Sequence, residues 1–371
     1  MTYLNNAGTS WPKPPEVAAA VGRVLTEPPP ATAGLLEEAT RNVAAFLGIA
    51  HPERLLFTTG CTAALALAFD DLEWQPGDVI VTSSMEHHGL IRPVERLVRT
   101  AGVRHHAVPR ASDGPICLER LETTLATSGV RLVAMTMAAN VTGEILPVGE
   151  ISELAHTHGA LVLIDAAQAT GIIPVDVERI GADMLAFAGH KGMLGPLGVG
   201  GIYIAPAVEL VGSTASCEIR AGVGASCTDW YFPTYCDVGG ASLPAIAGLA
   251  AGVRWVTERG VEALTAAGRR RVGRLLEGLV DLPEVSVHGH DRLEERTLAV
   301  SITHARVSPA ELEAYLQDGH GLSARAGHHC APMAACAIGT DNRGGTLRVS
   351  FGPFSNDSDV DTLITALTRL A

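Results

Sequence analysis

Short apolar segments rich in β-branched residues recur along the first half of this chain. Seven of them are candidate strands: 54–59, 78–83, 103–108, 131–137, 160–165, 183–188 and 200–205. Amphipathic segments such as GLIRPVERLVRTAG and VGEISELAHTHG lie between several of them. Near-continuous apolar strands that alternate with helices are typical of a mostly parallel sheet covered on both faces. The pattern therefore predicts an α/β fold whose ligands bind at the carboxyl ends of the strands.

The pattern changes after a predicted helix at about 243–258. The strand-like segments VSVHG, TLAVSIT and TLRVSFG alternate there with helical segments, and a helix ends the chain. We expect a large domain over 15–255 and a smaller α+β domain, βαβ-like in its connections, formed by 1–14 and 256–371. With 371 residues, 47% of them hydrophobic, the chain is long enough for two cores.

Composition excludes several classes of partner. The net charge of -13 leaves no basic surface for a nucleic-acid backbone. The N-terminus lacks the features of a signal peptide, and the most apolar stretch, ASLPAIAGLAAGV, is shorter than the ~18–20 residues that span a bilayer. Seven scattered cysteines without a C-x-x-C pair indicate a reduced, cytoplasmic protein. No H-x-x-x-H set or acidic ligand cluster is present, so we expect no metal.

Lysine occurs at only two positions, Lys13 and Lys191. Lys191 lies in FAGHKGMLGPLGVGG, between an apolar run and several glycines, where a solvated charge is out of place. A lysine that forms a Schiff base needs such a partly desolvated pocket, and flanking glycines would let the backbone approach a cofactor. A lysine in a surface loop is the alternative interpretation.

A carboxylate ends one of the predicted buried strands. Asp165 closes LVLID, and Gln168 follows three residues later. An ionised group there is costly unless a cation or a strong donor meets it. Asp165 is either a helix cap or the partner of a protonated pyridine nitrogen, as pyridoxal 5'-phosphate (PLP) sites require. The second interpretation fits Lys191 as the Schiff-base residue.

The segment FTTGCTAALALAF predicts a strand followed by a helix that begins near Cys61 and Thr62. The N-terminus of such a helix is a candidate phosphate site, because its N–H groups are free and its dipole is positive there. This signal is weak alone, since such turns are common. The glycines of GPLGVGG do not form an ordered G-x-G-x-x-G that opens a helix, which argues against NAD.

Several motifs occur in a consistent order over nearly the whole chain. They are YLNNAGTSWPKPP, TTGCTAAL, MEHHGLIRP, NVTGEILPV, LIDAAQATG, FAGHKGMLGPLGVG and ARAGHHCAPM. Together they resemble the class V aminotransferase family and, within it, the shorter desulfurase-like branch of the cysteine desulfurases and selenocysteine lyases. The resemblance implies PLP fold-type I, with a mostly parallel seven-stranded sheet in the large domain, and a homodimer.

The resemblance also implies roles for residues that bind the cofactor. Lys191 would hold PLP, Asp165 would pair with its pyridinium, and Gln168 would bind its ring oxygen. The phosphate would be bound by Thr62, the backbone N–H of Cys61, and His190, and His87 would stack on the ring and help to move protons.

Further roles concern the substrate. Asn140, also counted among the cofactor residues, and Arg348 would hold the substrate carboxylate, because a planar guanidinium suits a bidentate partner. Arg325 is a further candidate for substrate binding. Taken alone, Arg348 could also belong to a structural ion pair. The histidine pairs at 87–88 and 328–329 could likewise be structural residues of the core or the surface.

Cys330 decides the subclass. Most cysteines are inert small hydrophobes, but Cys330 follows Arg325, His328 and His329 in a glycine-containing loop. Nearby positive charge lowers the pKa of a thiol and favours the nucleophilic thiolate. In the family this cysteine attacks the sulfur of PLP-bound L-cysteine, which leaves alanine and an enzyme persulfide.

Three positions depart from the family pattern. Ala188 stands where a serine usually donates to the phosphate, Gly240 stands at a threonine that reaches the neighbouring subunit, and Asn5 replaces an aspartate. The two lost hydroxyl donors suggest weaker retention of the cofactor or a shifted specificity.

We therefore expect a PLP-dependent cysteine desulfurase-like enzyme that converts L-cysteine to L-alanine and transfers sulfur to Cys330. The first alternative is a C–S or C–Se β-lyase, acting on a cysteine conjugate or selenocysteine, in which Cys330 is dispensable. The second is a degenerate scaffold or sulfur-relay subunit, against which Lys191, Asp165, Gln168 and Arg348 argue. The expected partners are the amino-acid substrate and a sulfur-acceptor protein.

Overall fold

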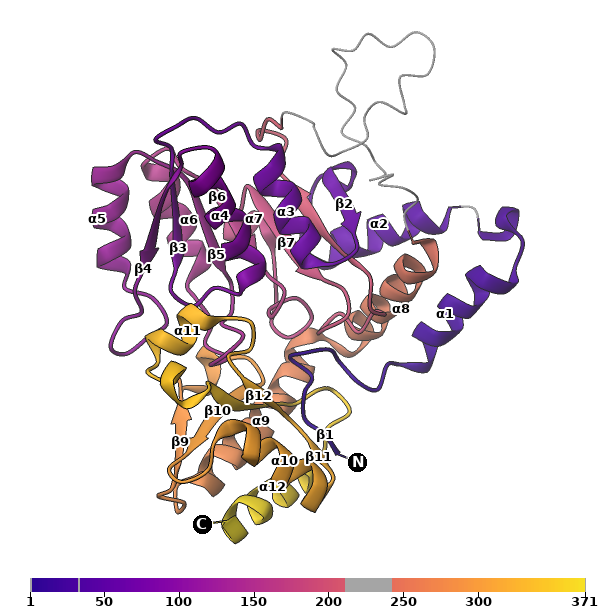
Figure 1. Ribbon diagram of the computed structural model, residues 1–371. Helices are drawn as coiled ribbons and strands as arrows, with labels where there is room; N and C mark the ends of the chain where they lie inside the picture. Colours follow the sequence, from indigo (N-terminus) through magenta and orange to yellow (C-terminus); the bar gives the residue numbers. More distant parts are fainter. Residues whose placement is uncertain (1, 33, 211–241, 371) are drawn as a thin grey trace, which may run out of the picture.

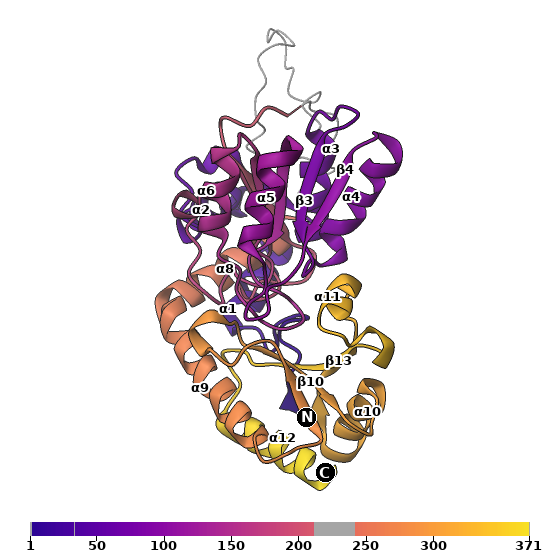
Figure 2. The same ribbon diagram turned by 90° about the vertical axis from the view of Figure 1, so that its left-hand side faces the viewer.

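The computed structural model describes residues 2–32, 34–210 and 242–370. These residues form a larger part that contains the central sheet, and a smaller part built mainly from the C-terminal third of the chain (Figures 1 and 2). The N-terminal strand β1 (Thr2–Tyr3) lies with the smaller part, where it pairs in parallel with β11 (Leu322–Ser323). The expected domain boundaries stay a prediction.

The central sheet contains all seven predicted strands. Its order is β2 (Leu55–Thr58), β8 (Gly200–Ile204), β7 (Met184–Ala188), β6 (Leu161–Asp165), β5 (Val130–Thr136), β3 (Val79–Ser83) and β4 (Arg104–Val108). Strand β8 runs antiparallel to both of its neighbours and the other pairs are parallel. The prediction of an α/β fold with a mostly parallel sheet is confirmed.

Helices cover both faces of this sheet, as Figure 2 shows. On one face α3 (Cys61–Asp71) and α4 (His88–Thr100) bury their apolar sides. The opposite face is covered by α2 (Leu35–Phe46), α5 (Leu118–Ser128), α6 (Val148–Thr157), α7 (Val177–Ile180) and α8 (Leu243–Arg259). Helix α1 (Pro15–Thr26) packs along α8. This double cover explains why the strands are apolar on both sides.

The smaller part has a four-stranded sheet in the order β12 (Arg325–Gly327), β13 (Thr346–Ser350), β10 (Ala299–His304) and β9 (Val285–His288). Its helices are α9 (Val261–Leu279), α10 (Pro309–His320), α11 (Pro332–Ala337) and α12 (Asp357–Leu370). Short 3-10 helices lie at Pro29–Thr32, Pro52–Arg54, Leu293–Glu295 and Asp341–Arg343.

The expectation of βαβ-like connections in this part fits one unit. Strands β10 and β12 both run antiparallel to β13 and are therefore parallel to each other, and α10 lies between them in the chain. Strands β9 and β10 pair antiparallel. The link from β9 to β10 holds only a loop and a 3-10 turn. A parallel crossover needs about a dozen residues or more and usually a helix, so this link reverses the chain instead.

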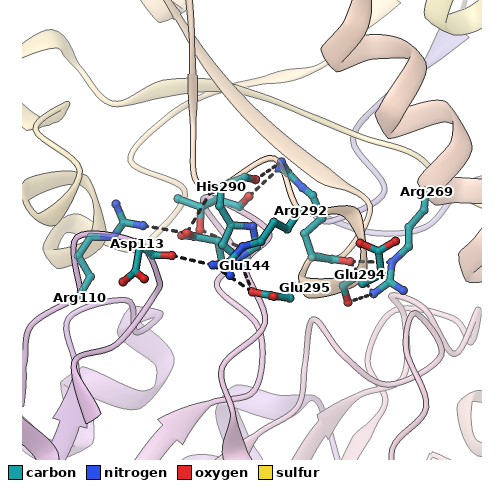
Figure 3. A network of polar contacts seen from close by, with 10 residues as sticks. Arg110, Asp113, Glu144, Arg269, His290, Arg292, Glu294 and Glu295 are labelled. Atoms are coloured by element: carbon teal, nitrogen blue, oxygen red, sulfur yellow. Dashed lines mark hydrogen bonds and ion pairs between the residues drawn. The ribbon is translucent and has the colours of Figure 1, made fainter. Parts of the chain in front are cut away.

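A buried polar network joins the two parts (Figure 3). Glu144, fully buried on the larger part, accepts hydrogen bonds from Arg110 at 2.8 Å and from the backbone N–H of His290 at 3.3 Å. Arg296, fully buried on the smaller part, donates to the carbonyls of His290, Thr142 and Ala299. The backbones of residues 144 and 296 also form an antiparallel bridge. Among the described residues, no helix is long and apolar enough to cross a membrane.

Candidate active site

A cavity of about 360 Å³ opens at the carboxyl ends of β5, β6 and β7, whose last residues Thr136, Asp165 and Ala188 line it. The N-terminus of α3 and strands β12 and β13 complete the wall. Every predicted site residue except Cys330 lines this cavity: Cys61, Thr62, His87, Asn140, Asp165, Gln168, His190, Lys191, Arg325 and Arg348. The fold therefore gathers residues from seven separate segments of the chain around one space.

Lys191 lies in the turn that follows β7. Removal from water lowers the pKa of its amine, while the nearby carboxylate of Asp165 acts in the opposite direction. Two nearby glycines allow close backbone packing. A Cβ on Gly192 would lie 2.4 Å from the carbonyl oxygen of Thr170, and one on Gly195 would lie 2.9 Å from the carbonyl oxygen of Gly189. The expected approach of the backbone to a cofactor stays a prediction.

The second lysine lies close to the first. Lys13 Nζ donates to Ser10 Oγ at 2.6 Å and to the backbone carbonyl of His190 at 2.8 Å. Burial lowers the pKa of Lys13 to about 8. Lys13 does not line the cavity, so its contacts hold the N-terminal segment against the turn that carries Lys191.

Asp165 is oriented by two donors. Its Oδ1 accepts from the backbone N–H of Ala167 at 2.9 Å and from the thiol of Cys61 at 3.3 Å. No hydrogen bond between described residues uses Oδ2, which is therefore available to a ligand. Burial, and then the charge of Asp165, raise the pKa of Cys61 well above its usual range, so this thiol keeps its proton. The sequence indicated only the backbone of Cys61, and its side-chain contact was missed.

Two neutral histidines line the cavity. His87 caps α4, and its Nδ1 accepts from the backbone N–H of Gly89 at 2.9 Å. Burial lowers the pKa of His87 to about 4, so its single proton resides on Nε2 at neutral pH. Burial also lowers the pKa of His190 to about 4, and its buried Nδ1 has no hydrogen-bond partner among the described residues.

Arg348 is almost fully buried and faces no carboxylate among the described residues. It donates to the carbonyl oxygen of Asn140 at 2.7 Å and to Asn5 Oδ1 at 3.5 Å. Burial, and then the charge of Arg325 opposite it in the β12–β13 pair, lower the pKa of Arg348 to about 10. Two cavity-facing guanidiniums without a protein counter-ion fit an anionic ligand. Asn5, a neutral residue, leaves the charge of Arg348 uncompensated.

The amide of Asn140 is held by the loop of Cys330. Its Nδ2 donates to the carbonyl of His329 at 2.6 Å, and its buried Oδ1 has no partner among the described residues. Gln168 Nε2 donates to the carbonyl of Ala7 at 3.0 Å. Ala188 lies in the cavity wall, where a serine was expected to donate, and Gly240 falls outside the described residues.

Cys330 lies beside the cavity in a tight loop in which both His329 and Cys330 have positive φ, 53° and 60°. Arg325 donates to its sulfur at 3.6 Å. The expected positive charge near Cys330 is present in Arg325, which contacts the sulfur. Burial lowers the pKa of His329 to about 3, and its Nε2 lies 2.9 Å from Thr346 Oγ1, so His329 adds no charge at neutral pH. His328 is exposed.

Glu86 is a site-supporting residue that the sequence did not single out. It is fully buried behind Asp165 and accepts from Ser83 Oγ and from the backbone N–H of Thr136 at 2.9 Å. Burial is the largest cause that raises the pKa of Glu86 to about 8. A neutral Glu86 adds no second negative charge near Asp165. Its only signal in the sequence is an acid between an apolar strand and a histidine pair.

The site fits PLP on several independent observations. The free Oδ2 of Asp165 suits a pyridinium, and Lys191 lies in the same cavity. The backbone N–H groups of Cys61 and Thr62, at the start of α3, make no hydrogen bond to described residues and suit a phosphate. The uncompensated Arg348 suits a carboxylate.

Comparison with known proteins decides the family. A model of aminotransferase class-V matches residues 2–363. The chain belongs to the class V aminotransferase family. This enzyme therefore depends on PLP and has PLP fold-type I.

Individual relatives agree with this family. A probable cysteine desulfurase of Mycolicibacterium paratuberculosis is 32% identical over 343 residues, which are 90% of this chain but 49% of that protein. A probable cysteine desulfurase of Methanothermobacter thermautotrophicus is 30% identical over 91% of this chain and 84% of its own length. The chain thus spans about half of the first relative and most of the second. The apo structure of a cysteine desulfurase from Thermococcus onnurineus NA1, 29% identical, superposes with a TM-score of 0.87 and covers all of this chain and 94% of its own.

Proposed function

We propose that this class V enzyme is a cysteine desulfurase, which removes sulfur from L-cysteine, releases L-alanine and holds the sulfur on Cys330. The observation that carries the proposal is the position of Cys330, beside Arg325 and at the edge of the cavity that contains Lys191 and Asp165. A lyase that releases sulfide directly needs no such thiol.

The cofactor would be held by the residues of the larger part. Lys191 would bind it covalently, Asp165 Oδ2 would pair with its ring nitrogen, and the N-terminus of α3 at Cys61 and Thr62 would bind its phosphate. When bound, PLP supplies an electron sink for bond cleavage next to the substrate's α-carbon. Gln168 and His190 face the same cavity and complete the proposed contacts.

The substrate carboxylate would bind to Arg348. This guanidinium is buried, charged at neutral pH and without a protein carboxylate, so an anionic ligand gains most from pairing with it. Asn140 Oδ1 is buried and accepts no hydrogen bond from the described residues. The substrate's ammonium group would supply the missing donor. Together they orient the substrate between the two parts of the molecule.

Two groups would move protons. Lys191, whose pKa is lowered by burial, takes and returns a proton at the substrate carbon. His87 keeps its proton on Nε2 because its Nδ1 is engaged by Gly89, and it can therefore donate from that edge.

Cys330 would accept the sulfur atom. Its thiolate, in contact with Arg325, would form a new S–S bond while the C–S bond of the substrate breaks. The thiol proton balances the hydrogen that the β-carbon gains. The overall reaction converts cysteine and a thiol to alanine and a persulfide without an external oxidant.

We also infer that the enzyme is a cytoplasmic homodimer that passes its sulfur to an acceptor protein. Two large apolar side chains support a second protomer: Trp11 is 53% exposed and Leu197, at the cavity rim, is 69% exposed. A persulfide at the edge of the cavity suits transfer to another thiol.

Product analysis with L-cysteine and a reductant tests the proposal. We expect alanine and sulfide in equal amounts, and an extra sulfur on the peptide that contains Cys330. Cys330→Ser should lower alanine production by orders of magnitude, because a hydroxyl is far too weakly acidic to replace the thiolate. Pyruvate and ammonia as products, or a Ser variant that releases sulfide at the wild-type rate, would establish the β-lyase reaction instead.

A further inference from the structure

Three side chains that bind soft metals meet at the edge of the cavity. One ligand atom from each of His87, His88 and Cys330 lies within 4.8 Å of the other two, and all three residues are half-buried. The backbone N–H of His88 donates to the carbonyl of Cys330 at 2.8 Å, which ties the cysteine loop to the start of α4. Sequence spacing could not indicate this group, because Cys330 is distant along the chain.

We propose that His87, His88 and Cys330 form a binding site for a soft monovalent cation, Cu⁺, which blocks the thiol of Cys330. Two imidazoles and one thiolate are the donor set of trigonal copper sites. The proposal concerns binding of a metal and does not depend on which reaction the enzyme catalyses.

His87 must change tautomer to take part. Its Nδ1 now accepts from Gly89, so the free edge is Nε2, which carries the proton. Metal binding at Nε2 moves this proton to Nδ1 and breaks the bond to Gly89. That loss is one partly buried helix-cap hydrogen bond, which is small compared with the binding free energy of a metal to a thiolate and two imidazoles.

The surrounding charges favour a monovalent cation. Arg325 lies 3.6 Å from the sulfur of Cys330, so any cation on this sulfur is repelled by a guanidinium. A thiolate with Cu⁺ is neutral overall, whereas a thiolate with Zn²⁺ keeps one positive charge beside Arg325. Soft thiolate ligands already select Cu⁺ over harder ions. We therefore expect Cu⁺ to bind more tightly than Zn²⁺.

The site has its own entry path. His87 and His88 also line a groove of about 690 Å³ along the exposed side of α4. Its charged lining consists of Arg92, Glu95, Arg96 and Arg99, which is mainly basic and also disfavours divalent ions. A Cu⁺ ion delivered by a carrier can reach Cys330 from this groove without entering the cavity.

Competition for Cu⁺ tests the site. The cofactor-loaded protein is titrated without oxygen against the coloured Cu⁺–bicinchoninate complex, and the Cu⁺ that the protein withdraws is counted. Other cysteines of the chain also bind Cu⁺. The informative quantity is therefore the number of tightly bound Cu⁺ ions that each variant loses relative to the wild type. His88→Ala and Cys330→Ser should each lose one tight equivalent or weaken it by more than about 100-fold, since even residues outside the ligand set cost about 10–100-fold.

Matched controls are available on the same loop and the following helix. His328→Ala removes an exposed histidine, and Cys336→Ala removes an exposed cysteine, neither of which belongs to the group. Both should keep the tight equivalent that His88→Ala and Cys330→Ser lose. Arg325→Ala should raise the affinity for Zn²⁺ more than that for Cu⁺. The proposal is overturned if His88→Ala retains every tight equivalent, which would show binding to the thiol alone, or if Zn²⁺ displaces Cu⁺ at equal concentration.

Discussion

At the scale of single residues, the two lysines differ in what they can reach. Lys191 lines the cavity with Asp165, whereas Lys13 donates to the carbonyl of His190 behind the same turn. Lys13 has a pKa of about 8, so it is chemically competent as an amine, and only its position excludes it. The scarcity of lysine in the sequence was therefore informative, but it could not show that both lysines lie near one turn.

Lys191→Ala should abolish covalent attachment of PLP and turnover of L-cysteine. Borohydride reduction followed by peptide mass spectrometry should find the adduct on Lys191 in the wild type and none in the variant. Lys13→Ala is the matched control and should keep the adduct, because its loss removes only contacts to Ser10 and His190. An adduct on Lys13 in either protein would contradict the assignment.

The backbone of Cys61 could be predicted from the sequence, but the contact of its thiol could not. The strand-to-helix turn in TTGCTAAL indicated its backbone, because helix N-termini bind anions wherever they occur. The bond from its thiol to Asp165 joins two residues 104 positions apart, and no local pattern encodes it. The close packing of the glycines around Lys191 was not predictable for the same reason, since much of the backbone that they contact comes from other segments.

At the scale of elements, most strands of the central sheet were predictable because burial on both faces makes them apolar throughout, although the edge strand β4 is largely exposed. The parallel direction of most of this sheet was also predictable, because helices alternate with its strands. The antiparallel position of β8 and the antiparallel pairs of the smaller part were not predictable. An apolar run alone indicates that a strand is buried and does not identify its neighbour. Connection lengths would have helped, since the short link between β9 and β10 cannot hold a helical crossover.

Glu86 joins two of these strands and should make stability depend on pH. It follows β3 and accepts from the backbone of β5 at Thr136. Its pKa is about 8 in the folded protein and 4.5 for an unperturbed glutamate, so the folded protein binds the extra proton between these limits. Its contribution to stability is complete below about pH 4.5 and is lost as the pH rises through 8.

Glu86→Gln, which resembles the protonated acid, should remove this dependence. Urea unfolding between pH 5 and 8 should show that the wild type loses stability relative to the variant as the pH rises. Asp78→Asn is a control at the other end of β3, where the carboxylate is partly exposed. Parallel curves for the wild type and Glu86→Gln would show that Glu86 is ionised in the folded protein.

At the scale of the whole molecule, the substrate site depends on how the two parts are joined. Asn140 belongs to the larger part and Arg348 to the smaller, and the loop of residues 139–144 connects Asn140 to the buried network of Glu144 and Arg296 (Figure 3). The backbone N–H of Thr297 donates to the carbonyl of Gly143 at 2.7 Å and fixes the same loop. The sequence showed NVTGEILPV as a family motif, but its contact with the smaller part needed the structure.

Glu144→Gln should therefore weaken substrate binding from a distance. It removes the negative charge near the buried Arg296 and weakens the bond to Arg110, at a cost of about 1–3 kcal/mol of unfolding free energy for a hydrogen bond to a charged group. The loop that carries Asn140 is then held less firmly in position relative to Arg348. We expect KM for L-cysteine to rise more than kcat falls, because Lys191 and Cys330 keep their surroundings.

Arg292→Ala supplies the control, since it belongs to the same network but pairs with Glu295 at the surface, where both side chains are about half exposed. Exposed pairs contribute roughly 0–1 kcal/mol, so this variant should leave both stability and KM close to wild type. If Glu144→Gln lowers stability but leaves KM unchanged, the network only joins the two parts. If KM rises with Glu144→Gln but not with Arg292→Ala, the effect must act through the structure, because no atom of residue 144 lines the cavity. The buried charge that joins the two parts then also aligns Asn140 with Arg348.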